Sequence, residues 1–217
     1  MKFYQKLDGA AHVSAREYDV ACDTVIAEGQ LVKLNKGLVV VADADEAGAI
    51  LGIAAENHSG KPDAIDPRSD GKKVFVIDDP HIVMQCKAPE VKATGGSDTS
   101  LEAAELSAFD NDDFNGGYVK LIRKAEESAN ADVIGQVRRI TGSSADALTL
   151  ESGGTPAEGD VYALFPPAGF AKGTLGNERA SLALDRKASL PVMVMGRDLG
   201  LGKINLIARK HLFAAKE

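Results

Sequence analysis

The chain has 217 residues, of which 44% are hydrophobic and 26% are charged, so it is long enough to bury a substantial core as one or two domains. Its net charge of −7, from 25 basic and 32 acidic residues, makes it a poor candidate for binding the phosphate backbone of a nucleic acid. The two cysteines are distant in sequence, which argues against a disulfide framework. The first segment has no apolar core, which argues against a secretory signal, and no run of about 20 apolar residues predicts a membrane-spanning helix.

The first 24 residues are only weakly patterned, because residues 8–11 (Asp-Gly-Ala-Ala) interrupt any periodicity. We interpret residues 1–24 as an extended N-terminal arm. A frayed terminus is the alternative.

From residue 25 the sequence becomes β-rich. Residues 31–34 and 38–42 are apolar runs that flank Asn35-Lys36-Gly37, and this pattern predicts a β-hairpin. Gly52 interrupts the next apolar run, which indicates a bulge or a close backbone approach. Further strands are expected over 73–77 and 81–86, which completes a first β module over residues 25–95.

A linker is expected over residues 96–117. Thr99 and Glu102 have the spacing of a capping box, which predicts a short helix directly after them. An acidic loop follows from Asp110 to Asn115. Asn111, Asp113 and Asn115 match the start of a calcium loop, but Ile122 stands where a bidentate Glu is required. A solvated acidic turn is therefore favoured, and weak cation binding stays open.

Residues 118–217 return to short strands separated by Gly-rich turns. Strands are expected over 118–123, over 133–140 with a possible bulge at Gly135, and over 148–150, 161–165, 190–195 and 203–207. Many short strands at this spacing are typical of barrels and sandwiches. We predict an all-β fold with minor α content: a β-barrel or β-tulip-like module followed by a second β-rich module over 118–217.

No set of residues with the spacing of an enzyme or metal site emerges. None of the four histidines, His12, His58, His81 and His211, lies two to four residues from another His or Cys, as a compact zinc site usually requires. Residues 78–81 (Asp-Asp-Pro-His) are better explained by the end of a strand than by a catalytic pair. We predict no enzyme, no cofactor and no metal ligand.

Two other charged motifs receive structural explanations. Gly200-x-Gly202-Lys203 lacks the remaining residues of a P-loop, so a hairpin turn explains its glycines. Arg138-Arg139 and residues 209–211 (Arg-Lys-His) are small basic spots on an acidic chain, and we interpret them as solvated faces.

The run from residue 25 to 60 resembles the head decoration, or cement, proteins of tailed phages. The residues that carry the resemblance are 25–32 (VIAEGQLV), 38–42 (LVVVA) and 48–54 (GAILGIA), and the match covers roughly residues 24–90. The resemblance implies a structural virion protein that binds the outside of a capsid and stabilises it, commonly as a trimer. The chain goes beyond the minimal module of that family by its second half.

The resemblance also implies partners and a location. The partners are the major capsid protein and two further copies of the chain, with no membrane and no direct nucleic-acid contact. The location is the capsid exterior of a virion assembled in the host cytoplasm. The N-terminal arm would pair with capsid strands, and its candidate contact residues are Phe3, Tyr4, Val13, Tyr18 and Val20. We expect removal of residues 1–24 to weaken capsid binding but to leave the fold intact.

Alternative functions stay open at this point. One is another structural virion protein, such as a tail-tube or head-fibre component. Another is a β module that binds a ligand such as a carbohydrate, although the aromatic residues of the chain are few and scattered.

Overall fold

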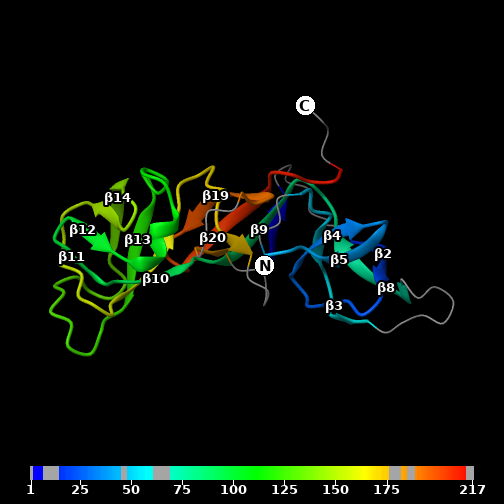
Figure 1. Cartoon of the computed structure of the whole chain (residues 1–217), viewed down its shortest axis with the longest axis horizontal. Coiled ribbons are helices and arrows are strands. Elements are labelled where there is room, and N and C mark those ends of the chain that lie inside the picture. Colours follow the sequence, from blue (N-terminus) through cyan, green and yellow to red (C-terminus); the bar gives the residue numbers. More distant parts are fainter. Residues whose placement is uncertain are drawn as a thin grey trace.

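A computed structural model describes residues 2–6, 15–44, 48–60, 69–175, 182–184 and 189–213. Their regular secondary structure is almost entirely β-strand, which confirms the predicted all-β class and the barrel. Figure 1 shows three β units in a row: a barrel at one end, a sheet in the middle and a larger sheet at the other end. The one helical element within the described ranges is a 3-10 helix, η1 (Ala104–Ala108).

The barrel closes in the order β2-β5-β4-β6-β8. Its strands are β2 (Arg16–Ala21), β4 (Leu31–Asn35), β5 (Leu38–Val41), β6 (Gly52–Ala54) and β8 (Ser69–Ile77). A small hydrophobic core of its own fills the barrel, formed by residues of its strands together with Ile26 of β3 and with Leu51: Val20, Ile26, Val32, Val39, Leu51, Ala54, Val74 and Val76. A short pair, β3 (Val25–Ile26) with β7 (His58–Ser59), lies beside the barrel strands.

Two local predictions for the barrel are confirmed. Lys36 and Gly37 connect β4 to β5 with φ angles of 52° and 86°, as a tight turn that matches strand twist requires. A Cβ atom on Gly52 would lie 2.0 Å from the carbonyl oxygen of Ile77. The backbones of β6 and β8 therefore approach too closely for any side chain at residue 52.

The middle sheet joins distant parts of the chain. It contains β1 (Lys2–Lys6), β9 (Ile82–Lys87), β20 (Lys203–Ala208) and β19 (Val192–Asp198), in the order β1-β9-β20-β19. All its neighbours are antiparallel. The last strands of the chain thus pair with β9 of the first half, so the predicted division into modules 25–95 and 118–217 does not follow the sheets.

The larger sheet has the order β10-β16-β13-β14-β15-β12-β11. Its strands are β10 (Glu90–Lys92), β11 (Gly95–Ser97), β12 (Ser100–Glu102), β13 (Tyr118–Arg123), β14 (Val137–Ser143), β15 (Ala147–Leu150) and β16 (Val161–Phe165). A separate short pair consists of β17 (Thr174–Leu175) and β18 (Leu182–Ala183).

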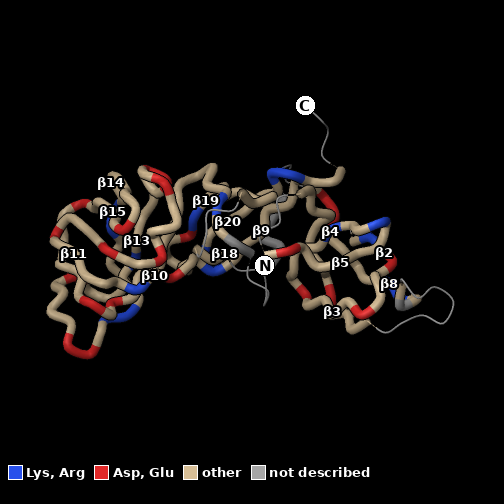
Figure 2. Tube along the Cα trace, viewed as in Figure 1, with Lys and Arg blue, Asp and Glu red and all other residues tan. Residues whose placement is uncertain are grey.

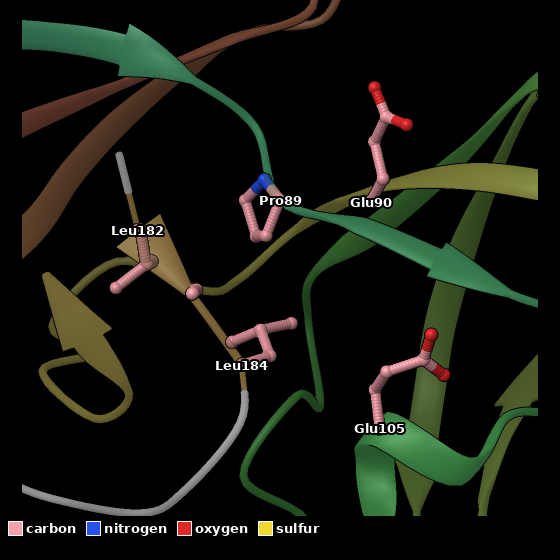
Figure 3. Close-up of a pocket in the computed structure, with 6 residues that line it drawn as sticks. Pro89, Glu90, Glu105, Leu182 and Leu184 are labelled. Carbon is pink, nitrogen blue, oxygen red and sulfur yellow. The ribbon is translucent and has the colours of Figure 1, made fainter. Parts of the chain in front are cut away.

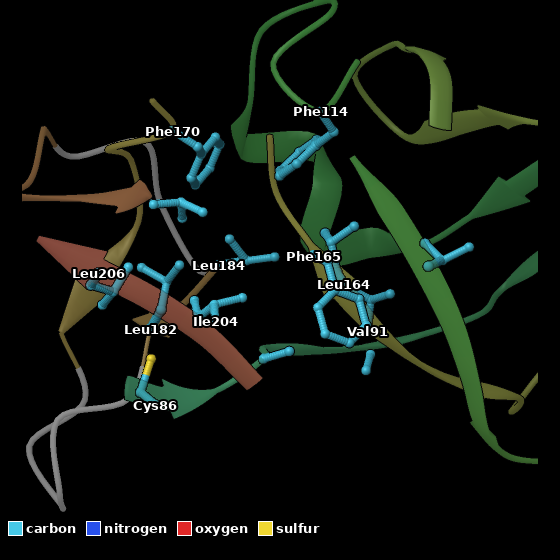
Figure 4. Packing of buried hydrophobic residues seen from close by; sticks show 14 of the residues in the cluster. Cys86, Val91, Phe114, Leu164, Phe165, Phe170, Leu182, Leu184, Ile204 and Leu206 are labelled. Carbon is cyan, nitrogen blue, oxygen red and sulfur yellow. The ribbon is translucent and has the colours of Figure 1, made fainter. Parts of the chain in front are cut away.

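The middle and larger sheets share one hydrophobic core. Figure 4 shows Ile204 and Leu206 of β20 in the same cluster as Leu164 and Phe165 of β16. The hairpin of β19 and β20 also holds the larger sheet through polar contacts. The guanidinium of Arg197 lies 5.0 Å from the ring centre of Tyr118, and Lys120 Nζ donates to the carbonyl oxygens of Leu199 and Gly200 at 2.8 and 3.1 Å.

The predicted short helix is present as the 3-10 helix η1, but the predicted capping box is wrong. Ser97 and Ser100 face each other across the β11–β12 hairpin, so Thr99 lies in its turn and Glu102 ends β12. The following η1 has no side-chain cap. The hydroxyl groups of this segment stabilise the hairpin turn and do not cap a helix, since Ser97 N donates to Ser100 Oγ at 2.9 Å.

The predicted strand over 133–140 begins late. Val133 and Ile134 lie in a turn, Gly135 has a φ of 95° there, and β14 starts only at Val137. The positive φ at Gly135 turns the chain rather than forming a bulge within a strand.

Candidate functional site

The five predicted arm residues do not stay together. Phe3 and Tyr4 belong to β1, Val13 lies outside the described residues, and Tyr18 and Val20 belong to β2. Val20 is completely buried in the barrel core. An arm over residues 1–24 is therefore wrong for its last part, since residues 16–21 are a barrel strand.

Polar contacts with Asp78 and Arg16 hold the side chain of Tyr18 in place. Its hydroxyl donates to Asp78 Oδ2, and Arg16 Nη1 lies 3.6 Å from the same oxygen. Burial and the bond to the Asp78 carboxylate together raise the pKa of Tyr18 to about 12. This side chain is committed to the barrel and is not free to contact a partner.

The remaining part of the arm, β1, is an edge strand. It pairs antiparallel with β9 from Lys2 opposite Gln85 to Lys6 opposite Ile82, with a register shift between Phe3 and Gln5. In the described part of the chain it has no second neighbour. An edge strand presents backbone donors and acceptors that a strand of another protein can pair with.

A second exposed feature is the turn before β14, which the sequence interpretation missed. Val133 and Ile134 are 66% and 63% exposed, and Val137 is 37% exposed. We call these three residues the apolar tip. Gly135 N donates to the carbonyl oxygen of Leu121 at 2.7 Å, which ties the turn to β13.

A buried polar network lies directly next to the apolar tip. Asn130 Nδ2 donates to Asp160 Oδ2 at 2.9 Å and to the hydroxyl of Tyr162 at 2.7 Å. Asn130 Oδ1 accepts a bond from the backbone N–H of Asp132 at 3.0 Å. Asp132 Oδ1 in turn accepts from Gly154 N at 2.6 Å. The loops on both sides of the tip are thus joined by side chains that are removed from water.

Arg138 completes this network, which corrects its interpretation as a solvated residue. Its side chain is 3% exposed, and its Nε and Nη1 atoms donate to the carbonyl oxygens of Glu151 and Gly154 at 2.9 and 2.8 Å. Its Nη1 lies 3.5 Å from Asp132 Oδ2. A buried guanidinium requires such partners, so Arg138 holds the loop at Glu151–Gly154 against β14. Arg139, the next residue, is exposed.

Asp160 anchors the other side of the network. Its carboxylate accepts hydrogen bonds from Ala125 N, Ser128 Oγ, Asn130 Nδ2 and Ala157 N at 2.9 to 3.1 Å. Burial alone would raise the pKa of Asp160, but these four donors outweigh it and lower the pKa below its ordinary value. The network therefore gives the apolar tip a rigid support.

A cavity of about 290 Å³ opens between β10, η1 and β18 (Figure 3). It is lined by Pro89, Glu90, Glu105, Leu182, Ala183 and Leu184. Glu105 Oε1 accepts a bond from Lys92 N at 3.3 Å, whereas its Oε2 is buried without a hydrogen-bond partner. Glu90 pairs with Lys87. The cavity is thus mainly apolar, with one unsatisfied carboxylate oxygen beside it.

The carboxylates of the acidic loop, residues 110–115, form ion pairs with the ammonium group of Lys172. Lys172 Nζ lies 2.6 Å from Asp113 Oδ1 and 3.2 Å from Asp110 Oδ2. The bonds to Asp113 and Asp110 raise the pKa of Lys172, against the opposing effect of burial. Its charge offsets that of the loop. Within the described ranges, no group of three or more His, Cys, Asp or Glu side chains could hold a metal ion.

The histidines do not assemble into a catalytic site among the residues described. His12 lies outside them, and His58 is buried beside the barrel. His81 is exposed, with Nδ1 3.5 Å from Asp79 Oδ1. His211 is buried near residues 78–81, and burial lowers its pKa. Its Nδ1 accepts a bond from Phe213 N at 3.1 Å, and its Nε2 has no hydrogen-bond partner.

None of the described helical turns is long and apolar enough to cross a membrane. The chain matches no known protein-family model, no curated protein and no solved structure. Among the described residues, the candidate functional features are the edge strand β1, the apolar tip on its polar support and the apolar cavity.

Proposed function

We propose that the chain is a structural virion protein that binds the outer surface of a phage capsid and stabilises it, as a decoration protein does. One observation carries this proposal. The segments that resemble head decoration proteins, 25–32, 38–42 and 48–54, contain β3, the start of β4, β5 and β6, and the last three of these strands belong to a closed five-stranded barrel. A barrel is the fold that the resemblance implies, so the local motifs and the three-dimensional arrangement agree.

The edge strand β1 provides a means of attachment. Lys2–Lys6 is held by backbone pairing to β9, and its other edge has no partner among the residues described. A strand of the major capsid protein adds to this edge through main-chain hydrogen bonds, which need no particular side chains.

The distribution of charge suits a protein partner. Acidic and basic residues are interspersed along the length of the molecule, as Figure 2 shows. The described part of the chain therefore carries no basic stripe of the kind that follows a phosphate backbone. Weak contacts between each copy and the capsid give strong overall binding when they are repeated around a symmetric shell.

The test is co-sedimentation of the purified protein with shells built from the cognate major capsid protein. The full chain is expected to bind saturably. A variant that lacks residues 2–6 should bind at least about tenfold more weakly, because five residues of strand pairing are lost. A second variant replaces residues 2–6 by a Gly-Ser segment of the same length and should also bind more weakly, because glycine weakens strand pairing. Equal binding by the full chain and both variants would contradict attachment through β1, and no binding by the full chain would contradict the function.

Deletion of residues 1–24 is no longer a suitable test. It would remove Arg16–Ala21 and so open the closed barrel, in which β2 pairs with both β5 and β8. We therefore expect this deletion to disrupt the fold, which replaces the expectation that the fold survives it.

A further inference from the structure

We propose that copies of this chain associate head to tail, with the apolar tip of one copy occupying the cavity beside Glu105 of the next. This inference rests on the proposed function, in which the chain works as an oligomer on a capsid, and it names the surfaces that would bring the copies together. The tip and the cavity are defined by different residues on the same molecule, so each copy offers one of each.

The tip has the properties of an anchor. Val133 and Ile134 are adjacent, apolar and about two-thirds exposed, which is unusual for two consecutive β-branched side chains. The buried bonds of Asn130, Asp132 and Arg138 hold the surrounding loops in place. A preorganised anchor loses little conformational entropy when it is buried, so its apolar area contributes efficiently to binding.

The cavity has the size and the apolar lining that such an anchor needs. Its apolar wall is formed by Pro89, Leu182 and Leu184, as Figure 3 shows. Its volume of about 290 Å³ is at the lower end of the range of small-molecule sites, which is ample for one branched aliphatic side chain. Entry of Ile134 would remove apolar surface from water on both copies.

Charge complementarity favours a second copy as the occupant. Val137 pairs with Lys120 and Arg139 with Tyr118 in the β13–β14 ladder, so the exposed Arg139 shares a face with Val137 of the tip. Across the contact, the cavity is lined by two carboxylate residues, Glu90 and Glu105. The positive charge of Arg139 beside the tip therefore meets a surface of opposite charge when Ile134 enters the cavity.

The association is heterologous, because one surface meets a different surface. Such contacts close into a ring when the rotation between copies allows it, and otherwise they form open chains. A single anchor buries less area than a stable complex needs, so we expect weak association in solution that is reinforced on the shell.

The test is sedimentation velocity over a wide range of protein concentration with three variants. Ile134→Asp removes the anchor and Ala183→Phe fills the cavity. Val25→Asp is the matched control, since Val25 is equally exposed but lies beside the barrel. The wild type and Val25→Asp should associate as concentration rises, whereas Ile134→Asp should stay monomeric, with a dissociation constant raised at least about tenfold.

Mixing the variants gives the sharpest result. Ile134→Asp keeps an intact cavity and Ala183→Phe keeps an intact tip, so an equimolar mixture should form 1:1 dimers and nothing larger. If Ala183→Phe does not fold, Arg139→Glu replaces it, and this variant alone should associate more weakly than the wild type.

Three outcomes would overturn the inference. They are a wild type that stays monomeric at every concentration, an Ile134→Asp variant that associates normally, and a tip variant that loses capsid binding when the wild type is itself monomeric. The last outcome would assign the tip to the capsid protein. Capsid binding by a wild type that does not self-associate would leave the proposed function standing, whereas self-association without capsid binding would remove that function alone.

Discussion

Replacing Asp160 by Asn tests the buried network that supports the apolar tip. The carboxylate is fully buried and accepts four hydrogen bonds, one at Oδ1 from Ala125 N and three at Oδ2 from Ser128, Asn130 and Ala157. The substitution keeps the volume of the side chain but replaces one acceptor atom by a donor. Only electrostatics and hydrogen bonding change, so the measured effect belongs to the network.

The size of the effect follows from the better of the two amide orientations. If the amide oxygen keeps the three donors at the Oδ2 position, the amide N–H₂ must face the N–H of Ala125. One hydrogen bond to a charged group is lost, at about 1.5–3 kcal/mol, and the other three lose their ionic component. We therefore expect Asp160→Asn to lower the free energy of unfolding by about 3 kcal/mol.

The assay is urea denaturation followed by circular dichroism, at pH 7 and at lower pH. The pKa of Asp160 is lowered in the folded protein, so its contribution to stability is present above the ordinary Asp pKa of about 4 and is lost as the pH falls through the folded value. The stability difference between wild type and variant should narrow below about pH 4.

The matched control for this experiment is Asp146→Asn, because Asp146 is exposed in a turn. It should change the stability by less than about 0.5 kcal/mol. Equal stability of Asp160→Asn and Asp146→Asn would refute the assignment of a structural role to the network, as would a difference that does not depend on pH.

Two further predictions concern the barrel and the cysteines. Gly52→Ala should lower the free energy of unfolding by about 3 kcal/mol or more, because the added Cβ would collide with the backbone oxygen of Ile77. Gly142→Ala is the control and should be tolerated, since its Cβ would meet nothing within 3.5 Å. Thermal unfolding of the two variants checks this. Cys86 is buried, and burial raises the pKa of its thiol to about 11. Iodoacetamide at pH 8 should therefore modify the partly exposed Cys22 and reach Cys86 only after unfolding. Peptide mass spectrometry checks this, and equal rates of modification at the two cysteines would contradict the buried position of Cys86.

Strands with strong local patterns were predictable from the sequence. Residues 118–123 and 161–165 form strands with the predicted bounds, and the turn at Lys36-Gly37 has the expected positive φ angles. These features depend on neighbouring residues alone. Alternation of apolar and polar residues also indicates a strand within residues 1–24, which we did not predict. Tyr18 and Val20 alternate with acidic residues, which is the pattern of the barrel strand β2.

The same alternation distinguishes Arg138 from Arg139. In β14 the exposed Val137 and Arg139 alternate with the buried Arg138 and Ile140, so the position of Ile140 indicates that Arg138 faces the core. Its partners were not predictable, because the carbonyl oxygens that it binds come from Glu151 and other loop residues outside its own strand.

The sheet pairings were beyond local reasoning. Pairing of β9 with β20 joins residues more than one hundred positions apart, and no local pattern specifies such a register. The unsatisfied carboxylate of Glu105 and the cavity beside it likewise exist only because β10, η1 and β18 meet in space. The candidate site was for this reason less predictable than the strands that form it.

The most direct test of the central claim is a cryo-electron microscopy reconstruction of capsids assembled with and without this protein. We expect added density on the outer surface at symmetric lattice positions, with a capsid strand paired to the free edge of β1 and the tip of one copy next to the cavity of its neighbour. Shells that are identical with and without the protein, or density on the inner surface, would contradict it.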